Sequence, residues 1–298
     1  MKTYRLSPPA ALEMMARIET MHAPMRYETI GSNVLMFVGD DYQSVATAFL
    51  DGDDVLLVDA LGSMDDALAL RRVLCEELGK TVRVIAATHY MSDHGAAMSL
   101  FPEALTVAHR QHRQTFLSQN RCVHAFYREP KLVFDVGMSL RWGAHELHFV
   151  HNPGKTADHV SVDVPSADLV CAGDNIVGNI VYLSRADPVM LRAAIGRMRQ
   201  FGRGTVIGGH MGRFPAVTLD NAVHYLDRLQ QIVVDIRACV PMDGVAGRVA
   251  AIRIEDCVAP GVEPSDFERK WHGHNLEVIV SQSVFALDAA VAAREVRA

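Results

Sequence analysis

Residues 88–95 of the chain have the sequence THYMSDHG, which places His89, Asp93 and His94 within one short segment. An apolar run typical of a buried strand, residues 82–87, precedes it, and residues 96–101 after it are expected to open a helix. Neutral imidazoles and carboxylates are common metal ligands, and a loop at a strand end can turn them toward one point. The segment therefore predicts a metal site, with an ordinary polar surface loop as the alternative.

Length, composition and charge exclude several classes of protein. The 298 residues suffice for one large domain or two smaller ones, and five scattered cysteines without a C-x-x-C pair indicate reduced thiols. A formal net charge of −6 predicts neither nucleic acid nor an anionic membrane surface as a partner. Because no apolar run approaches the ~18 residues of a membrane span and no signal-peptide core is recognisable, we expect a cytoplasmic protein.

Short apolar runs predict a mixed α/β fold. The expected strands cover residues 34–38, 45–50, 55–58, 82–87, 105–108, 133–134, 138–142, 146–150, 160–164, 169–172 and 205–207. Helices are expected over residues 64–78 and from Asp187-Pro188 to Phe201, where aspartate caps the helix and proline takes its first position. A β-meander followed by βαβ units predicts mixed sheets.

The two ends of the chain look helical. Residues 10–21 have a helical period, and beyond Pro215 helices are expected over about 218–239, 245–254 and 275–294. We therefore divide the chain into an N-terminal arm over residues 1–30, a core over residues 31–215 and a helical C-terminal extension over residues 216–298 that packs on the core.

Four places in the core share one property, since a histidine or aspartate follows directly where a predicted strand ends. They are residues 89–94, residues 155–159, Asp174 and His210. A sheet fixes the position of groups on such loops while leaving them reachable. One such residue is usually structural or solvated, but four in series indicate a shared site.

At this point the sequence resembles the metallo-β-lactamase-fold superfamily over about residues 34–213. Its His-x-His-x-Asp-His motif, Pro-Gly-His-Thr turn, Gly-Asp strand end and Gly-His pair correspond in order to residues 89–94, 153–156, 173–174 and 209–210. The resemblance implies an αββα sandwich, in which two mixed β-sheets are flanked by helices and the metal ligands lie at their edge. It also implies a structural role behind the site for Asp59.

One of the two metal sites of the family is altered in this chain. Where the family has three histidines, this sequence has His89, Met91 and Lys155. A thioether is a poor ligand for divalent zinc or iron, and an ammonium group repels a cation. We therefore expect no metal here, with the Lys155 ammonium supplying the missing charge and pairing with Asp174. The alternative is a lysine that points into solvent.

The other metal site of the family is intact. The resemblance implies that Asp93, His94 and His210, with Asp174 as a fourth donor, hold one divalent ion per chain. Two histidines and one or two carboxylates suit zinc, iron or manganese, and zinc is the first expectation.

Three residues are predicted to take part in catalysis, namely His89, Asp93 and Lys155. His89 would act as a general base or a substrate contact, with a core histidine bonded to backbone as the alternative. Lys155 would orient or polarise an anionic or carbonyl group of the substrate.

Other residues are predicted to contact the substrate. Tyr90, Met91 and His159 would line the pocket, although His159 would equally support a ligand from behind. The segment WHGH at residues 271–274 is expected to precede the last helix and to cover the pocket mouth or form an oligomer contact.

The leading hypothesis is a metal-dependent hydrolase that uses one metal-bound water to cleave an ester, lactone, amide or thioester bond of a small molecule. A mononuclear non-haem iron oxygenase or oxidoreductase is the second hypothesis, because Asp93, His94 and His210 form a 2-His-1-carboxylate set. The third is a non-catalytic protein that binds a small molecule. In each case we expect a homodimer.

Overall fold

Two β-sheets form the centre of the computed structural model, which describes residues 25–119 and 124–286. The first sheet has the strand order β1 (Arg26–Gly31), β2 (Val34–Val38), β3 (Val45–Asp51), β4 (Asp54–Val58), β5 (Thr81–Ala86), β6 (Leu105–His109) and β7 (Leu132–Phe134). The second has the order β13 (Arg213–Pro215), β12 (Thr205–Gly208), β11 (Leu169–Gly173), β10 (Val160–Val164), β9 (His145–His151) and β8 (Gly137–Trp142).

Both sheets are mixed, as the sequence predicted. In the first, β1 to β4 pair antiparallel and β4 to β7 pair parallel. In the second, the pair β11–β12 is parallel and the other neighbours are antiparallel. The parallel strands matter most for function because their carboxyl ends carry the loops with the predicted ligands.

A shared hydrophobic layer holds the two sheets face to face. Phe49 and Leu56 of the first sheet belong to the same buried cluster as Phe149 and Val162 of the second. Alternate side chains of each strand point into this layer, so the opposite faces need their own cover. The central layer is thus a β-sandwich.

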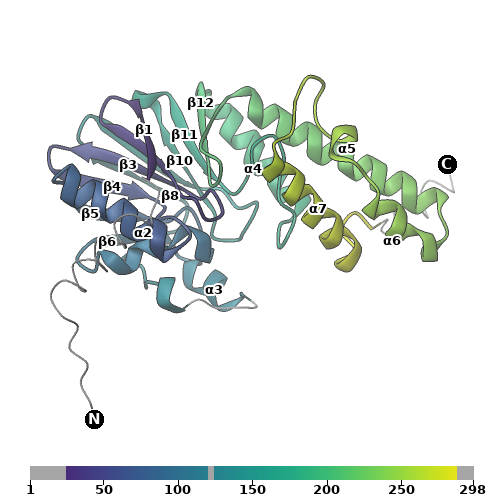
Figure 1. Cartoon of the computed structure of the whole chain (residues 1–298), viewed down its shortest axis with the longest axis horizontal. Coiled ribbons are helices and arrows are strands. Elements are labelled where there is room, and N and C mark those ends of the chain that lie inside the picture. Colours follow the sequence, from purple (N-terminus) through teal and green to yellow (C-terminus); the bar gives the residue numbers. More distant parts are fainter. Residues whose placement is uncertain (1–24, 120–123, 287–298) are drawn as a thin grey trace, which may run out of the picture.

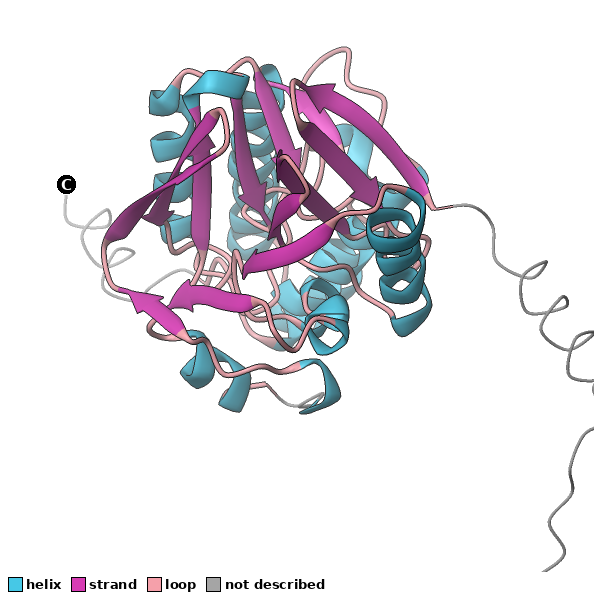
Figure 2. Cartoon of the chain, turned by 90° about the vertical axis from the view of Figure 1, so that its left-hand side faces the viewer, coloured by secondary structure: helices cyan, strands magenta, loops and turns pink. Residues whose placement is uncertain are grey.

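Helices cover the outer face of each sheet (Figures 1 and 2). On the first sheet lie α2 (Met64–Arg71) and a π-helical continuation (Arg72–Glu77), packed against residues such as Leu57. On the second lie α4 (Pro188–Phe201) and α5 (Val217–Cys239). Asp187 caps α4, as predicted, by accepting hydrogen bonds from the backbone N–H groups of Val189 and Met190. The αββα sandwich is confirmed.

The remaining helices are α3 (His112–Leu117), α6 (Met242–Ala250), α7 (Asp266–Ser281) and 3-10 turns at Ser92–His94, Ala96–Leu100, His124–Phe126, Pro165–Ala167 and Ile254–Asp256. Figure 1 shows α5, α6 and α7 grouped beside the sandwich. Their apolar side chains join the cluster on the outer face of the second sheet, including Tyr225, Val249 and Ile279.

The predicted start of the last helix was wrong. Helix α7 begins at Asp266 rather than near residue 275, and Ser265 and Glu268 form a capping box at its start. The side chains of Glu268, His272 and Asn275 are buried at helical spacing. Because polar residues interrupt the buried face before Leu276, the apolar period that marks most helices is weak in the first half of α7. The WHGH segment therefore lies inside α7.

The N-terminal predictions are only partly covered by the structure. The expected helix over residues 10–21 lies outside the described residues, whereas β1 begins at Arg26, within the stretch assigned to the arm. Within residues 25–119 and 124–286, none of the helices combines the length and the apolar character needed to cross a lipid bilayer.

Candidate metal centre

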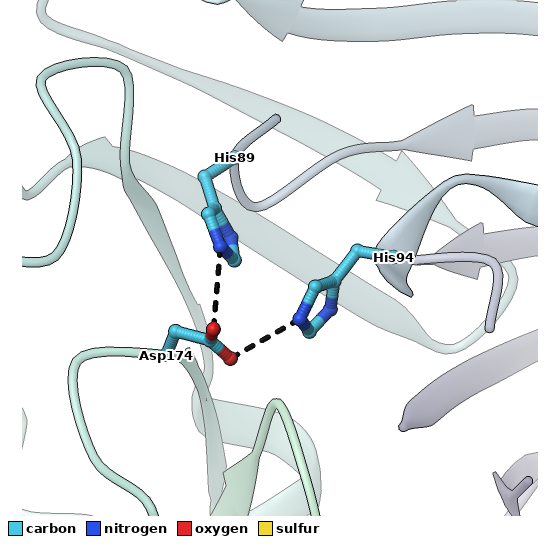
Figure 3. Close-up of side chains that lie close together, drawn as sticks. All are labelled: His89, His94 and Asp174. Atoms are coloured by element: carbon cyan, nitrogen blue, oxygen red, sulfur yellow. Dashed lines mark ion pairs between the residues drawn. The ribbon is translucent and has the colours of Figure 1, made fainter. Parts of the chain in front are cut away.

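The predicted ligands meet where strands from both sheets end. His89 and the Ser92–His94 turn follow β5 of the first sheet. Asp174 follows β11 and His210 follows β12 of the second sheet. Figure 3 shows the side chains of His89, His94 and Asp174 pointing toward one another from these separate segments.

The Asp174 carboxylate lies at the centre of the cluster. Its Oδ1 atom is 3.1 Å from His94 Nε2 and 3.3 Å from His210 Nε2, and its Oδ2 atom is 3.5 Å from His89 Nε2. Asp93 contributes a second carboxylate, with Oδ2 3.6 Å from His210 Nε2. Three imidazoles and two carboxylates therefore converge on a volume the size of a metal site.

A relay of hydrogen bonds orients His89. Thr88 Oγ1 lies 2.8 Å from Asp59 Oδ2 and 3.0 Å from His89 Nδ1. The carboxylate can only accept, so the single hydroxyl proton goes to Asp59 and Thr88 accepts from the Nδ1–H of His89. Consequently the other ring nitrogen of His89, Nε2, is the one that faces Asp174.

His210 is held in the same tautomer by the main chain. Its Nδ1 lies 2.8 Å from the carbonyl oxygen of Tyr42, and since that oxygen can only accept, Nδ1 carries the proton. Tyr42 and Met211 have positive φ values of 60° and 70°. Such backbone conformations are costly for residues with a side chain and tend to occur at functional sites.

The residues fit a divalent ion. His89 Nε2, His94 Nε2 and Asp174 Oδ1 are buried without a hydrogen-bond partner among the described residues, although buried polar groups normally have one. Two sets of donors lie within 4.8 Å of one another, His89 with His94 and Asp174, and Asp93 with His94 and His210. A cation would satisfy these lone pairs together.

Glycine keeps the space around the carboxylate free. A Cβ atom at Gly209 would lie 2.2 Å from Asp174 Oδ1 and 2.9 Å from His94 Cε1. Any other residue at this position would therefore displace the cluster, which explains the glycine directly before His210.

The charges of the cluster shift its pKa values strongly. Burial alone would raise the pKa of Asp174, but His94, His210 and His89 hold it well below its usual value. Burial alone would lower the pKa of His94, but Asp174 and its other acidic neighbours raise it well above the usual value. The cluster therefore favours an ionised Asp174 carboxylate next to positive charge, either on the histidines or on a bound cation.

The expected ion pair between Lys155 and Asp174 is not formed. The side chain is fully buried, and Nζ donates to the carbonyl oxygen of Ser184 at 2.8 Å and lies 3.8 Å from the ring centroid of Tyr182. The space around Asp174 is already taken by His89, His94 and His210, so the lysine turns away. The alternative, a lysine in solvent, is also wrong.

Lys155 nevertheless responds to the cluster. Burial lowers its pKa to about 8, against the opposing effect of the carboxylates of Asp174 and Asp93. The Lys155 ammonium is thus close enough to interact electrostatically with Asp174 and Asp93 without an ion pair.

Tyr90 and His159, which were predicted to contact the substrate, are both buried. Tyr90 is 3% exposed and its ring packs edge-on against those of His112 and Phe116. His159 is fully buried, stacks on His89 at 4.8 Å and accepts the backbone N–H of Asp174. Met91 is partly exposed next to the ligand turn.

Some residues at the centre were not predicted from sequence. Thr88 orients His89, and Phe267 and Trp271 of α7 have ring centroids 5.6 Å and 6.2 Å from that of His210. For Thr88, the signal in the sequence was its position directly before His89, a predicted site residue. For α7 the signal was the WHGH segment, which we considered only as a cover or an oligomer contact.

The αββα sandwich, with imidazoles and carboxylates buried where its strands end, indicates a class of proteins with this fold that bind metals. The sequence model of the metallo-beta-lactamase superfamily matches residues 39–210, more than half of the chain. The chain therefore belongs to that superfamily. No curated protein matches its sequence.

Solved structures agree at the level of the fold. The metallo-beta-lactamase from Pontibacter korlensis aligns with a TM-score of 0.61 at 18% identity, covering 68% of this chain and 99% of that one. The DIM-1 metallo-beta-lactamase aligns with a TM-score of 0.59 at 16% identity, covering 69% and 98%. The metallo-beta-lactamase from Erythrobacter litoralis gives 0.57 at 15%, covering 69% and 97%. At such identities the likeness concerns architecture and not activity.

Proposed function

We propose that the chain is a mononuclear metal-dependent hydrolase that cleaves an ester, lactone, amide or thioester bond of a small molecule. The observation that carries this proposal is the convergence of the side chains of Asp93, His94 and His210 on the buried Asp174 carboxylate. Superfamily membership supports a metallohydrolase in general, and the substrate, the metal and the count of one ion are our inference.

Asp93, His94 and His210 would hold the ion, with Asp174 as the fourth donor. When bound, a divalent ion lowers the pKa of a water ligand and so supplies hydroxide near neutral pH. The side chain of Asp93 keeps 14% of its surface exposed, more than the 4% of Asp174, so it is the more accessible carboxylate for a proton.

His89 and Lys155 would act on the other side of Asp174. The lone pair of His89 Nε2 accepts a proton or contacts the substrate, since Thr88 fixes the proton on Nδ1. Lys155 takes the place of a second metal by adding positive charge near the reacting carbonyl, where a developing negative charge is stabilised.

The same donors leave one alternative with a specific basis. Asp93, His94 and His210 lie together as two histidines and one carboxylate, which is also the ligand set of non-haem iron oxygenases. Iron chemistry on this fold is therefore the second candidate, and a protein that only binds a small molecule is the third.

Elemental analysis of protein purified without added metal, combined with assays on ester, lactone and thioester panels, tests the proposal. We expect about one zinc, or one manganese, per chain and hydrolysis that continues without oxygen. Bound iron with substrate-dependent oxygen uptake would establish the oxygenase instead. Two ions per chain would refute the mononuclear site, and binding without turnover would leave only the third candidate.

A further inference from the structure

Helix α7 supplies an aromatic surface directly beside the metal centre. The rings of Phe267 and Trp271 lie 5.7 Å apart, and both face the ring of His210 at an interplanar angle of 37°. Both side chains remain partly exposed, unlike His210, which is buried. The outermost layer on this side of the ligand is therefore aromatic.

Tyr182 joins this surface to Lys155. Its ring centroid lies 4.4 Å from that of Trp271, and the Lys155 ammonium lies 3.8 Å from the same centroid. A cation over a tyrosine face is favourable and fixes the ring. Tyr182 thus connects Trp271, which lies near His210, with Lys155, which belongs to the altered side of the candidate metal centre.

The fold fixes these rings in place through α7. Asn275 accepts the backbone N–H of Leu183 at 2.8 Å and donates to the carbonyl oxygen of Val181 at 2.7 Å. Glu268 accepts the backbone N–H of Asn179 at 2.7 Å. All three bonds tie α7 to the segment that carries Tyr182, and Asn275 and Glu268 are buried. These hydrogen bonds explain why α7 has the polar residues Glu268 and Asn275 at buried positions.

One polar atom on this surface has no partner. The indole Nε1 of Trp271 is buried without a hydrogen-bond acceptor among the described residues, whereas Nε1 of the other tryptophan, Trp142, donates to the carbonyl oxygen of Phe49. A buried tryptophan N–H usually finds an acceptor. Because this atom is buried, a ligand oxygen can accept from it only if the indole shifts, so the aromatic faces carry the argument rather than this N–H group.

We propose that Trp271 and Tyr182 form the substrate-binding surface that selects compounds with a planar aromatic group, so that the hydrolase acts on aryl-bearing esters, lactones or thioesters. This inference rests on the proposed function and names its substrate class. An aryl group packs against the two rings in the offset or edge-to-face geometry that aromatic pairs prefer, which an alkyl group of similar reactivity cannot match.

Two thioesters of one thiol, phenylacetyl- and acetyl-N-acetylcysteamine, separate aryl recognition from intrinsic reactivity. We expect Trp271→Leu in the metal-loaded protein to lower kcat/KM for the phenylacetyl compound about tenfold, mainly through KM, because aromatic contacts and burial are lost. The acetyl compound should change less than about twofold, since it does not reach the surface. Trp271→Phe should retain most of the preference, and Val280→Ala, an exposed position on the same helix, should behave as wild type.

A binding measurement keeps the inference testable without turnover. In Trp142→Phe, Trp271 is the single tryptophan, so its fluorescence should change saturably with phenylacetate and not with acetate. If no thioester is cleaved but this response is present, the proposed hydrolysis fails and the aromatic surface stands. If both thioesters are cleaved with the same ratio in Trp271→Leu and in wild type, and phenylacetate gives no response, the inference is refuted. Equal metal content in all variants excludes misfolding of the centre.

Discussion

The two sides of the candidate metal centre differ in their predicted ligands, and one supporting residue is common to both. On one side, Asp93, His94 and His210 form a complete candidate set, with His210 held by the carbonyl of Tyr42. On the other side, His89 stands beside methionine and lysine. Yet His89 keeps its full relay through Thr88 to Asp59.

A shared residue explains why the scaffold of the altered side persists. Asp59 Oδ2 accepts from Thr88 at 2.8 Å and also lies 3.4 Å from His94 Nδ1. The Asp59 carboxylate, which orients His89 through Thr88, therefore also lies next to His94, a predicted ligand of the intact side. Outer partners of metal ligands typically matter 10- to 100-fold for metal affinity or activity, so loss of Asp59 would damage both sides. The comparison shows that Met91 and Lys155 alter one side only, whereas the support through Asp59 serves both sides.

The largest expected effect comes from breaking the intact side. His210→Ala should reduce bound metal to well below one ion per chain and lower hydrolysis more than about 100-fold, because even outer partners contribute 10- to 100-fold. Metal-to-chain ratio and kcat/KM measure this. His148→Ala is the matched control, since that histidine lies on β9, is partly exposed and contacts Ser139 rather than the centre. Full metal retention in His210→Ala would disprove the ligand assignment.

Rebuilding the altered side should have the next largest effect. We expect Met91→His combined with Lys155→His to raise the metal content from about one to about two ions per chain, because the third imidazole of that side, His89, is already oriented. Elemental analysis of the double variant decides this, with each single variant as a control. A double variant that still binds one ion would show that the split between the two sides is not set by these residues.

The sequence predicted most of the fold from local patterns, and the family resemblance carried by short motifs indicated the candidate ligands. Apolar strands that end in Asp or His, such as β11 before Asp174 and β12 before His210, bring both signals into one short segment. The carboxyl ends of neighbouring parallel strands then meet at one edge, so residues far apart in sequence were expected to converge. This is the arrangement that the structure has.

Predictions that depend on tertiary contacts were less successful. The partner of Lys155 could not be predicted, because a flexible side chain of four methylenes selects among neighbours that only the folded chain defines. The predicted start of helix α7 was wrong for a related reason. Three of its buried residues, Glu268, His272 and Asn275, are polar and form hydrogen bonds with distant segments. No local period signals such a helix.

A last expected effect concerns the stability of the metal-free protein and comes from Lys155 itself. Its pKa falls from 10.5 to about 8 in the folded chain, because burial disfavours the charged form. Between these two values the unfolded chain binds the proton and the folded chain does not, so the free energy of unfolding rises with pH. Below about pH 8 both states are protonated and the full penalty is present.

Chemical denaturation of metal-free protein at pH 7.5 and pH 10 should show this penalty. At about 1.4 kcal/mol per pKa unit, Lys155 adds up to about 3 kcal/mol to the free energy of unfolding across the window. Lys155→Met lacks the titrating group, so the difference between wild type and variant isolates it from other residues that titrate at high pH. Because methionine carries no charge, the variant should be the more stable protein at pH 7.5 and lose that advantage by pH 10. A constant difference at both pH values would mean that Lys155 keeps an ordinary pKa, so that burial does not disfavour its charge in the folded chain.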